Sequence, residues 1–252
     1  MESTKDMDTS DGVDRAQQSL QTALEDVGGG DRNLSPKEMK YLVGAEEILG
    51  ALRMHRAQAQ ESIVTMLPAL PPAEMLQRSL VGDVEMVQRG VAYRSIYPLA
   101  ALSDRWVFDY ARQVAVHGAQ VRSGQVGTIH FAIFDSQVVI LSEVKGDARS
   151  AVALLTDSPG TVKGFIDKFE LIWRQSVDLA ILSTGVQLLS HDMTVLRFIG
   201  ENKLNDAIAR ELDMTVPTVN RSVRRLKDFF EVESKGALQV LAHRLGLVRD
   251  ER

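Results

Sequence analysis

Residues 205–230 read NDAIARELDMTVPTVNRSVRRLKDFF, and this stretch determines the fold predicted for the C-terminal part of the chain. Its apolar spacing predicts a short helix over residues 205–212 and a second helix over residues 216–229, joined by a tight turn. Thr215 can cap the second helix, and Pro217 suits the first helical turn because its missing N–H would have no partner there. The stretch therefore predicts two short helices in close contact.

The second helix divides into an apolar face and a polar face. The inner face has Val219, Val223, Leu226 and Phe230, and the outer face has Asn220, Arg221, Arg224 and Lys227. Reading the major groove of DNA needs several long hydrogen-bond donors on one rigid helix, with arginine suited to guanine and asparagine to adenine. An ordinary solvated face is the alternative. The turn, the apolar inner face and the small Ala209 at the helix crossing favour DNA.

Residues 188–247 resemble the LuxR-type DNA-binding domain. The resemblance rests on Val195, Leu196, Asn205, Ile208, Ala209, Leu212, Thr218, Val219, Val223, Leu226, Val232, Ser234 and Lys235. A final helix over residues 236–247 fits the four-helix plan of that domain. The sequence departs from the family pattern at Asp213, where the turn usually has glycine, at Ser222, where histidine is frequent, and at His191-Asp192, which replaces an Arg-Glu pair.

This resemblance implies base contacts from the start of the second helix and phosphate contacts around it. The predicted DNA-binding residues are Thr215, Thr218, Asn220, Arg221, Arg224, Arg225 and Lys227. Leu238, Leu241 and Leu245 of the final helix would help two chains to dimerise. The whole chain has a net charge of −5, but residues 190–252 have eleven basic and ten acidic residues, a local charge of +1. A local basic face can bind a phosphate backbone whatever the overall charge.

The middle of the chain resembles a different family. Residues 128–142 read TIHFAIFDSQVVILS, which resembles a strand pair of the phospholipase D superfamily. That superfamily uses His-x-Lys, four further residues and Asp, with histidine as nucleophile and lysine holding the phosphate. His130 is present, but Ala132 stands at the lysine position and Gln137 at the aspartate position. The resemblance therefore implies that the fold is retained and the chemistry is lost.

Degenerate domains of this kind serve as effector-binding domains in regulators that resemble the TrmB family. Residues 89–98 (RGVAYRSIYP) and residues 165–173 look like parts of such a domain. The candidate effector-binding residues lie at or near predicted strand ends, where ligand pockets form: Arg94, Tyr97, Arg122, His130 and Glu143. A surface or structural role is the alternative for each of them.

Strand-like and helix-like segments alternate through this middle region. The predicted strands are residues 62–67, 92–97, 129–134 and 138–142, and the predicted helices are residues 73–89, 104–118 and 161–177. This order predicts an α/β domain over residues 61–178, followed by a helical linker over residues 179–187.

The N-terminal region is polar and acidic. Residues 1–33 are predicted to be mostly disordered, and Ser35, Pro36 and Glu38 form a helix-start signal. The signal predicts a helical arm over residues 34–60. Its apolar heptad spacing, which includes Leu42, Leu49 and Leu52, fits pairing with a second chain and packing on its own domain equally well.

Composition excludes several classes of protein. The 252 residues include no cysteine, which excludes disulfides and thiolate sites and fits a reducing cytoplasm. The sequence has no run of about 18 apolar residues, so no membrane partner or membrane span is expected, and no signal-peptide core is visible. We expect no cofactor, metal or catalytic residue.

Together these observations predict an α+β multidomain chain, with a central α/β phospholipase D-like domain and an all-α four-helix LuxR-type helix-turn-helix domain over residues 188–252. We expect a transcription regulator, an activator by family resemblance, that binds operator DNA as a homodimer. RNA polymerase and a small-molecule effector are the further partners expected. The alternatives are a phosphodiesterase or nuclease of phospholipase D fold and a protein-interaction module built on the C-terminal helices.

Overall fold

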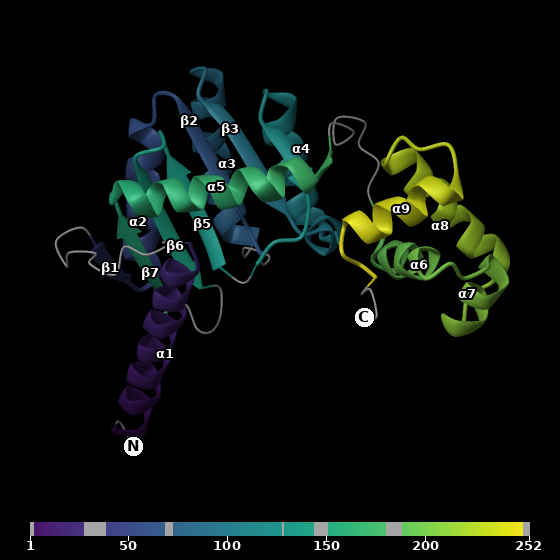
Figure 1. Cartoon of the computed structure of the whole chain (residues 1–252), viewed down its shortest axis with the longest axis horizontal. Helices are drawn as coiled ribbons and strands as arrows, with labels where there is room; N and C mark the ends of the chain where they lie inside the picture. The colour runs from purple at the N-terminus through teal and green to yellow at the C-terminus, as the bar shows by residue number, and fades with distance from the viewer. Residues whose placement is uncertain are drawn as a thin grey trace.

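The computed structural model describes residues 3–27, 39–68, 73–127, 129–143, 151–179 and 188–248. In this part of the chain, eight strands form one sheet with helices on both faces, and four helices form a second unit beside it (Figure 1). The order of the strands across the sheet is β1-β7-β6-β5-β2-β3-β4-β8. The mixed α+β architecture agrees with the predicted fold class.

Four strands of the central sheet follow the predicted segments closely. The bounds of all eight strands are β1 Met39–Val43, β2 Ser62–Met66, β3 Ala92–Tyr97, β4 Gln120–Ser123, β5 Ile129–Phe134, β6 Val138–Glu143, β7 Val152–Thr156 and β8 Val177–Asp178. Strands β2, β3 and β4 run parallel to one another, and the other pairings are antiparallel. The four predicted strands are confirmed, whereas β1, β4, β7 and β8 were not foreseen.

The β5–β6 hairpin turns tightly at Asp135 and Ser136, whose φ angles of 51° and 56° are left-handed. Two such residues in succession suit the right-handed twist of a hairpin. The Asp135 carboxylate also accepts hydrogen bonds of 2.9 Å from the backbone N–H groups of Gln60, Glu61 and Ser62. The turn therefore ties β5 to the start of β2.

Helices cover both faces of the sheet. Their bounds are α1 Ser3–Val27, α2 Ala45–Gln58, α3 Ala73–Gln88, the 3₁₀ helix η2 Leu99–Ser103, α4 Arg105–Val116, α5 Pro159–Gln175, α6 Ser190–Gly200, α7 Asn205–Glu211, α8 Val216–Phe229 and α9 Lys235–Arg244. Helices α1 and α5 pack on one face of the sheet, and α2, α3 and α4 pack on the other. Each face has its own apolar core.

The N-terminal segment is helical, where sequence predicted mostly disorder over residues 1–33. Leu20, Ala23 and Leu24 lie on the same side of α1 and are buried in the core that this helix shares with α5 and the sheet. The other end of α1 extends away from the rest of the chain (Figure 1). The polar composition of this segment hid three apolar side chains that become buried only against a sheet formed by later residues.

The predicted helical arm over residues 34–60 is replaced by β1 and α2. Gly44, with φ 88°, separates the two elements, and Ser35, Pro36 and Glu38 lie outside the described residues. Leu42 is 1% exposed and faces the chain's own core, while Leu49 and Leu52 face the sheet from α2. The apolar spacing is thus satisfied within one chain, which corrects the predicted dimer contact at these three leucines. Of the predicted linker over residues 179–187, residues 180–187 lie outside the described residues.

The four-helix unit of α6 to α9 has a core of its own that is continuous with the core under α4. Leu238, Leu241 and Leu245 are buried in this unit, so the predicted dimer contact through them is corrected in the same way. Helix α6 packs against η2, and the rings of Phe108 on α4 and Phe229 on α8 lie 6.3 Å apart between centroids. The two units therefore meet through η2 and α4.

We predict that Leu20→Ala lowers the free energy of unfolding by about 2–5 kcal/mol, because it leaves a cavity between α1 and the sheet. Gln21→Ala, at an exposed position of the same helix, should change it by no more than about 0.5 kcal/mol. Urea unfolding followed by circular dichroism measures both. Equal effects of the two variants would show that α1 does not pack on the sheet.

Candidate functional site

Helices α7 and α8 occupy the places predicted for the two helices around the turn. Ile208 and Ala209 of α7 and Val219 of α8 are buried where the helices meet. Asp213, in the turn, has φ 52°, the left-handed conformation that glycine adopts most easily and that aspartate tolerates better than most residues. The Met214 N–H then donates to the Ala209 carbonyl at 2.8 Å and closes α7. The departure from glycine at this position is therefore compatible with a tight turn.

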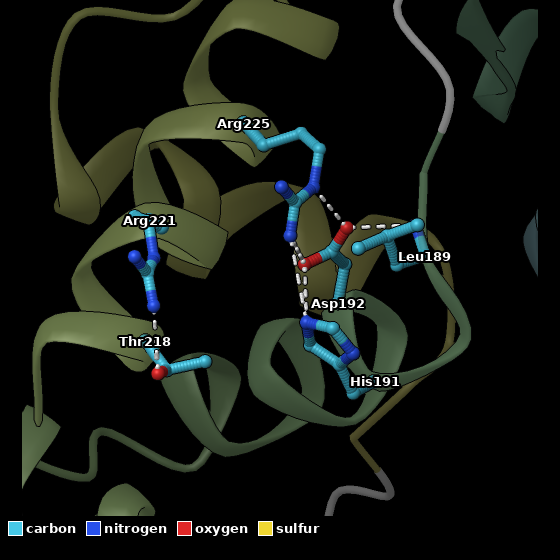
Figure 2. Close-up of polar contacts among 6 residues, drawn as sticks. All are labelled: Leu189, His191, Asp192, Thr218, Arg221 and Arg225. Atoms are coloured by element: carbon cyan, nitrogen blue, oxygen red, sulfur yellow. Dashed lines mark hydrogen bonds and ion pairs between the residues drawn. The ribbon is translucent and has the colours of Figure 1, made fainter. Parts of the chain in front are cut away.

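The start of α8 is a network of exposed polar side chains. Thr215 caps the helix, and its hydroxyl lies 2.8 Å from that of Thr218. Arg221 donates to the Thr218 hydroxyl at 3.1 Å, as Figure 2 shows, and the Asn220 side chain accepts a hydrogen bond of 2.8 Å from Asn205 on α7. Four of the predicted DNA-binding residues are thus held together at one end of the helix.

Asn205 was noted in the sequence only as part of the family resemblance, but it joins three helices. Its side-chain oxygen accepts a 2.7 Å hydrogen bond from Lys235 Nζ at the start of α9, and its amide nitrogen donates to Asn220. Lys235 also donates to the backbone carbonyl of Lys203 at 2.9 Å. This chain of contacts positions Asn220 on the surface of α8.

Arg224 and Lys227 lie further along the outer face of α8. Arg224 is exposed, and within the described residues it makes no hydrogen bond or ion pair. Lys227 is partly buried, also without such a partner among the described residues. Both side chains lie on the outer face of α8, and their role in binding DNA stays a prediction.

Arg225 does not belong to this outer face, which corrects its prediction as a DNA-binding residue. Its guanidinium points to α6 and donates to the two carboxylate oxygens of Asp192 at 2.6 and 2.8 Å (Figure 2). A helix advances about 100° per residue, so Arg225 lies within about 60° of Ser222 and Phe229, which are both buried. The sequence placed it with its charged neighbours, but its position on the helix turns it toward the core.

Asp192 is the fully buried partner in this pair. Its side chain is 0% exposed, against 26% for Arg225, and it also accepts a 2.7 Å hydrogen bond from the N–H of Leu189. Burial alone would raise the pKa of the Asp192 carboxyl, but the hydrogen bonds from Arg225 and Leu189 outweigh burial and lower the pKa below its ordinary value. The carboxylate stays charged and fixes α8 against the first turn of α6.

The five candidate effector-binding residues do not form one site. Arg94 donates to Glu170 at 2.7 Å, and Arg122 donates to the Trp173 carbonyl at 2.8 Å, both on the α5 face of the sheet. Their guanidinium groups also lie over aromatic rings of α5. These two arginines therefore pack α5 onto the sheet, which corrects their prediction as ligand contacts.

Tyr97 and His130, in contrast, lie on the opposite face and line one pocket between the sheet and helices α2, α3 and α4. Asp83 and Tyr110, which the sequence analysis did not single out, line the same pocket. Glu143 is paired with Ile129 in the sheet, and its side chain lies outside the described part of the structure. The sequence does give one indication of Asp83: it is an acidic residue on the otherwise apolar face of α3.

In the described residues, no group of three or more His, Cys, Asp or Glu side chains could hold a metal ion. None of the helices described is long and apolar enough to cross a membrane.

We predict that Arg225→Ala lowers the free energy of unfolding by roughly 3 kcal/mol at neutral pH, because it leaves the Asp192 charge buried without its partner. Arg224→Ala, one residue away and exposed, should change it by less than about 0.5 kcal/mol. Chemical unfolding of the two variants measures this difference, and equal stabilities would mean that Arg225 is not an anchor.

The Asp192–Arg225 pair should also make the loss of stability in Arg225→Ala depend on pH. The pKa of Asp192 is lowered in the folded chain, so its stabilisation is present above the ordinary aspartate pKa near 4 and is lost as pH falls through the lower folded value. The stability gap between wild type and Arg225→Ala should therefore shrink as the pH falls below about 4. A gap that stayed constant to pH 2 would contradict the ionic nature of the contact.

Comparison with known proteins gives remote similarities of fold. No protein-family model and no curated protein matches the chain. Among solved structures, Nuc of Salmonella typhimurium, a phospholipase D family member, has a TM-score of 0.47 at 17% identity, over 56% of this chain and 98% of that one. TrmBL2, an archaeal chromatin protein, has 0.42 at 16% identity, over 64% of this chain and 61% of that one, and NucT of Helicobacter pylori has 0.43 at 15%, over 56% and 99%. At TM-scores below 0.5, these similarities say nothing about what this chain binds.

Proposed function

We propose that this chain is a sequence-specific DNA-binding transcription regulator that reads duplex DNA with α8. The observation that supports the proposal best is the composition of the outer face of α8. Asn220, Arg221 and Arg224 are exposed within the first three turns of this helix, on the side opposite to its buried residues. Side chains of this kind, at the end of a helix that can enter the major groove, make the hydrogen bonds that distinguish bases.

The surroundings of α8 support a reading role because they hold the helix rigidly. Arg225 and Asp192 fix its rotation against α6, and the Asn205–Asn220 hydrogen bond fixes its start against α7. A protein gains affinity and selectivity when its contacting side chains are ordered before binding. With Arg225 engaged, Arg221, Arg224 and Lys227 are the cations that α8 offers to DNA.

We further propose that the unit of α6 to α9 is a LuxR-type domain and that the chain acts as a homodimer, as an activator that works with RNA polymerase. The assignment is supported by the presence of four helices in this unit, which fits the four-helix plan of that domain. Two copies would bring two reading helices to half-sites about one turn of DNA apart. Because the leucines of α9 are buried, a contact between copies would use exposed side chains such as Val240.

We also propose that the domain that contains the eight-stranded sheet, called the sheet domain below, has no phosphodiesterase activity. Ala132 lies on the same face of β5 as His130, in the position where the phospholipase D pattern has lysine, and it supplies no charge to a phosphate. Arg56, which also lines that pocket, is paired with Asp83 at 3.0 Å. We expect no hydrolysis of bis-p-nitrophenyl phosphate above background. Turnover that disappears in His130→Ala would establish the enzyme instead.

The DNA-reading proposal predicts different outcomes for two neighbouring side chains. The binding sequence is first selected from random duplex DNA with the full chain. Arg224→Ala should then lower affinity for the selected sequence by about 1–3 kcal/mol and relax preference at one position. Lys227→Ala should weaken all sequences similarly and reduce the slope of log affinity against log salt by about one unit, because it loses a phosphate contact.

Arg78→Ala, an exposed arginine of α3, is the matched control and should leave both quantities unchanged. Circular dichroism confirms that each variant is folded. A folded Arg221→Ala, Arg224→Ala double variant that binds the selected sequence as tightly as wild type would rule out α8 as the reader. Failure to select any sequence, with no salt-dependent binding, would favour the protein-interaction alternative.

A further inference from the structure

A pocket of about 110 Å³ lies between the central strands and helices α2, α3 and α4. One side of it is apolar and is lined by Leu49, Leu52, Ile63, Leu67, Leu76, Ala132 and Phe134. For comparison, a dry apolar cavity of about 150 Å³ accepts a benzene ring. The pocket is smaller than that cavity but is partly open to solvent, so it can hold one small ring whose edge remains at the opening.

The other side of the pocket is polar, and most of its groups are paired with one another. Tyr110 donates to one carboxylate oxygen of Asp83 at 2.6 Å, and Arg56 donates to the other at 3.0 Å. The hydroxyl groups of Thr65 and Ser95 lie 2.8 Å apart. These contacts explain why charged and hydroxyl groups are tolerated beneath three helices.

Tyr97 is the exception on this polar side. Its side chain is 1% exposed, and its hydroxyl is close to those of Tyr93 and Ser95 but meets neither in hydrogen-bonding geometry, nor any other described residue. Buried hydroxyl groups in proteins nearly always have a partner, so an unpaired one that lines a pocket indicates a missing partner. A ligand atom in the pocket would supply it.

His130 offers a second polar atom on the same face of the sheet. Its Nδ1 lies 3.1 Å from the Ser142 hydroxyl, which leaves Nε2 without a hydrogen bond among the described residues. Burial lowers the pKa of His130 to about 4, so the ring is neutral at pH 7. The imidazole can then donate or accept one hydrogen bond without bringing a charge.

The register of the sheet places these two groups on either side of Leu67. Met66 on β2 is paired with Ile96 on β3 and with Phe131 on β5. One residue further along the same direction, Leu67 therefore lies between Tyr97, which ends β3, and His130 of β5. Neighbouring strands are about 4.8 Å apart, so the two backbones are separated by about 10 Å across Leu67. A ring that packs on Leu67 would lie between the two side chains, with its polar group turned toward one of them.

The charges inside the pocket favour a neutral occupant. The Arg56 and Asp83 charges neutralise one another, and the remaining polar groups on this wall are hydroxyls and a neutral imidazole. Arg53, which also borders the pocket, is exposed to solvent. A charged ligand would lose its hydration inside without gaining a counter-charge.

Two segments lead directly from this pocket to the helices that contain the proposed reading face. Tyr110, in the pocket wall, and Phe108, beside Phe229 of α8, both belong to α4. Tyr97 is followed after one residue by η2, which packs against α6. Helix α4 and η2 therefore connect the wall of the pocket to α8 and α6.

We propose that this pocket binds a small uncharged ring compound with a hydrogen-bonding group, held between Tyr97 and His130, and that α4 and η2 transmit its presence to α8. The second half of this proposal rests on the proposed function of α8. Any ligand that changes the affinity for DNA in this way must itself bind with an affinity that DNA changes by the same factor.

Phenol is the probe for the binding step, used with the full chain in the absence of DNA and followed by ligand-observed NMR and by the thermal unfolding midpoint. Phenol should bind and raise the midpoint, benzene should bind at least fivefold more weakly because it lacks the hydroxyl, and benzoate should not bind because it is charged. Binding of benzoate as strong as that of phenol, or no binding of phenol, would overturn the proposal.

Two variants test the location of the site. Tyr97→Phe should weaken phenol about fivefold or more without lowering the unfolding midpoint of the ligand-free chain, since the lost hydroxyl has no partner there. A lower midpoint with unchanged phenol affinity would assign Tyr97 a structural role and overturn the site. Ala132→Leu should fill the pocket and abolish binding, whereas Ala57→Leu, at an exposed position of α2, should not change it.

The transmission step is read without DNA, as amide hydrogen exchange of α6 and α8 with and without phenol. Saturating phenol should change exchange in these helices at least twofold in the wild type and not in Ala132→Leu. Phenol that binds without changing exchange would overturn the transmission. The affinity for the selected DNA is then measured with phenol, and a change of at least threefold is expected. If the chain binds no DNA, only the proposed function is refuted. The phenol-binding and hydrogen-exchange measurements are made without DNA and still test the pocket and the transmission.

Discussion

The alternation of side chains along the central strands is the constraint on which the rest of this structure depends. Successive residues of a strand point to opposite faces, so Tyr93, Ser95 and Tyr97 lie beneath α2 to α4, whereas Arg94 and Ile96 lie beneath α5. A shift of β3 by one residue would exchange the two sets and bring the Arg94 guanidinium into the pocket. The same register therefore keeps the pocket neutral and places the arginine beside Glu170 and the rings of α5.

In the four-helix unit, one ion pair has a comparable role. Asp192 is fully buried, the hydrogen bonds from Arg225 offset the effect of burial on its pKa, and the pair fixes which side of α8 faces α6. Because Arg225 is turned inward, the residues on the far side of the helix, Asn220 and Arg224, are turned to solvent. The surface that we propose for DNA is thus defined by a contact on the opposite side of the same helix.

Helix α4 links the pocket to the proposed reading helix, because it contacts both. Helix α4 contacts both units: Tyr110 donates a hydrogen bond to Asp83 in the pocket, and the ring of Phe108 lies against that of Phe229 on α8. Packed interiors are dense and transmit strain, which is the physical basis of the transmission that we propose through α4. This arrangement makes the sheet domain a direct support of the helices and gives the two units a shared core.

The sequence by itself determined the elements whose signals are local. Periodicity located β2, β3, β5, β6 and the helices from α3 to α5 and α7 to α8, and the cap at Thr215 and the turn at Asp213 required only neighbouring residues. Tertiary structure alone decided the rest. Leu20 and Leu42 become buried against strands that follow more than a hundred residues later, and Arg225 finds Asp192 across a helix interface. Tyr97 and His130 line one pocket only because the fold places β2 between β3 and β5. Such contacts depend on which surfaces meet in three dimensions, and spacing along the chain does not contain that information.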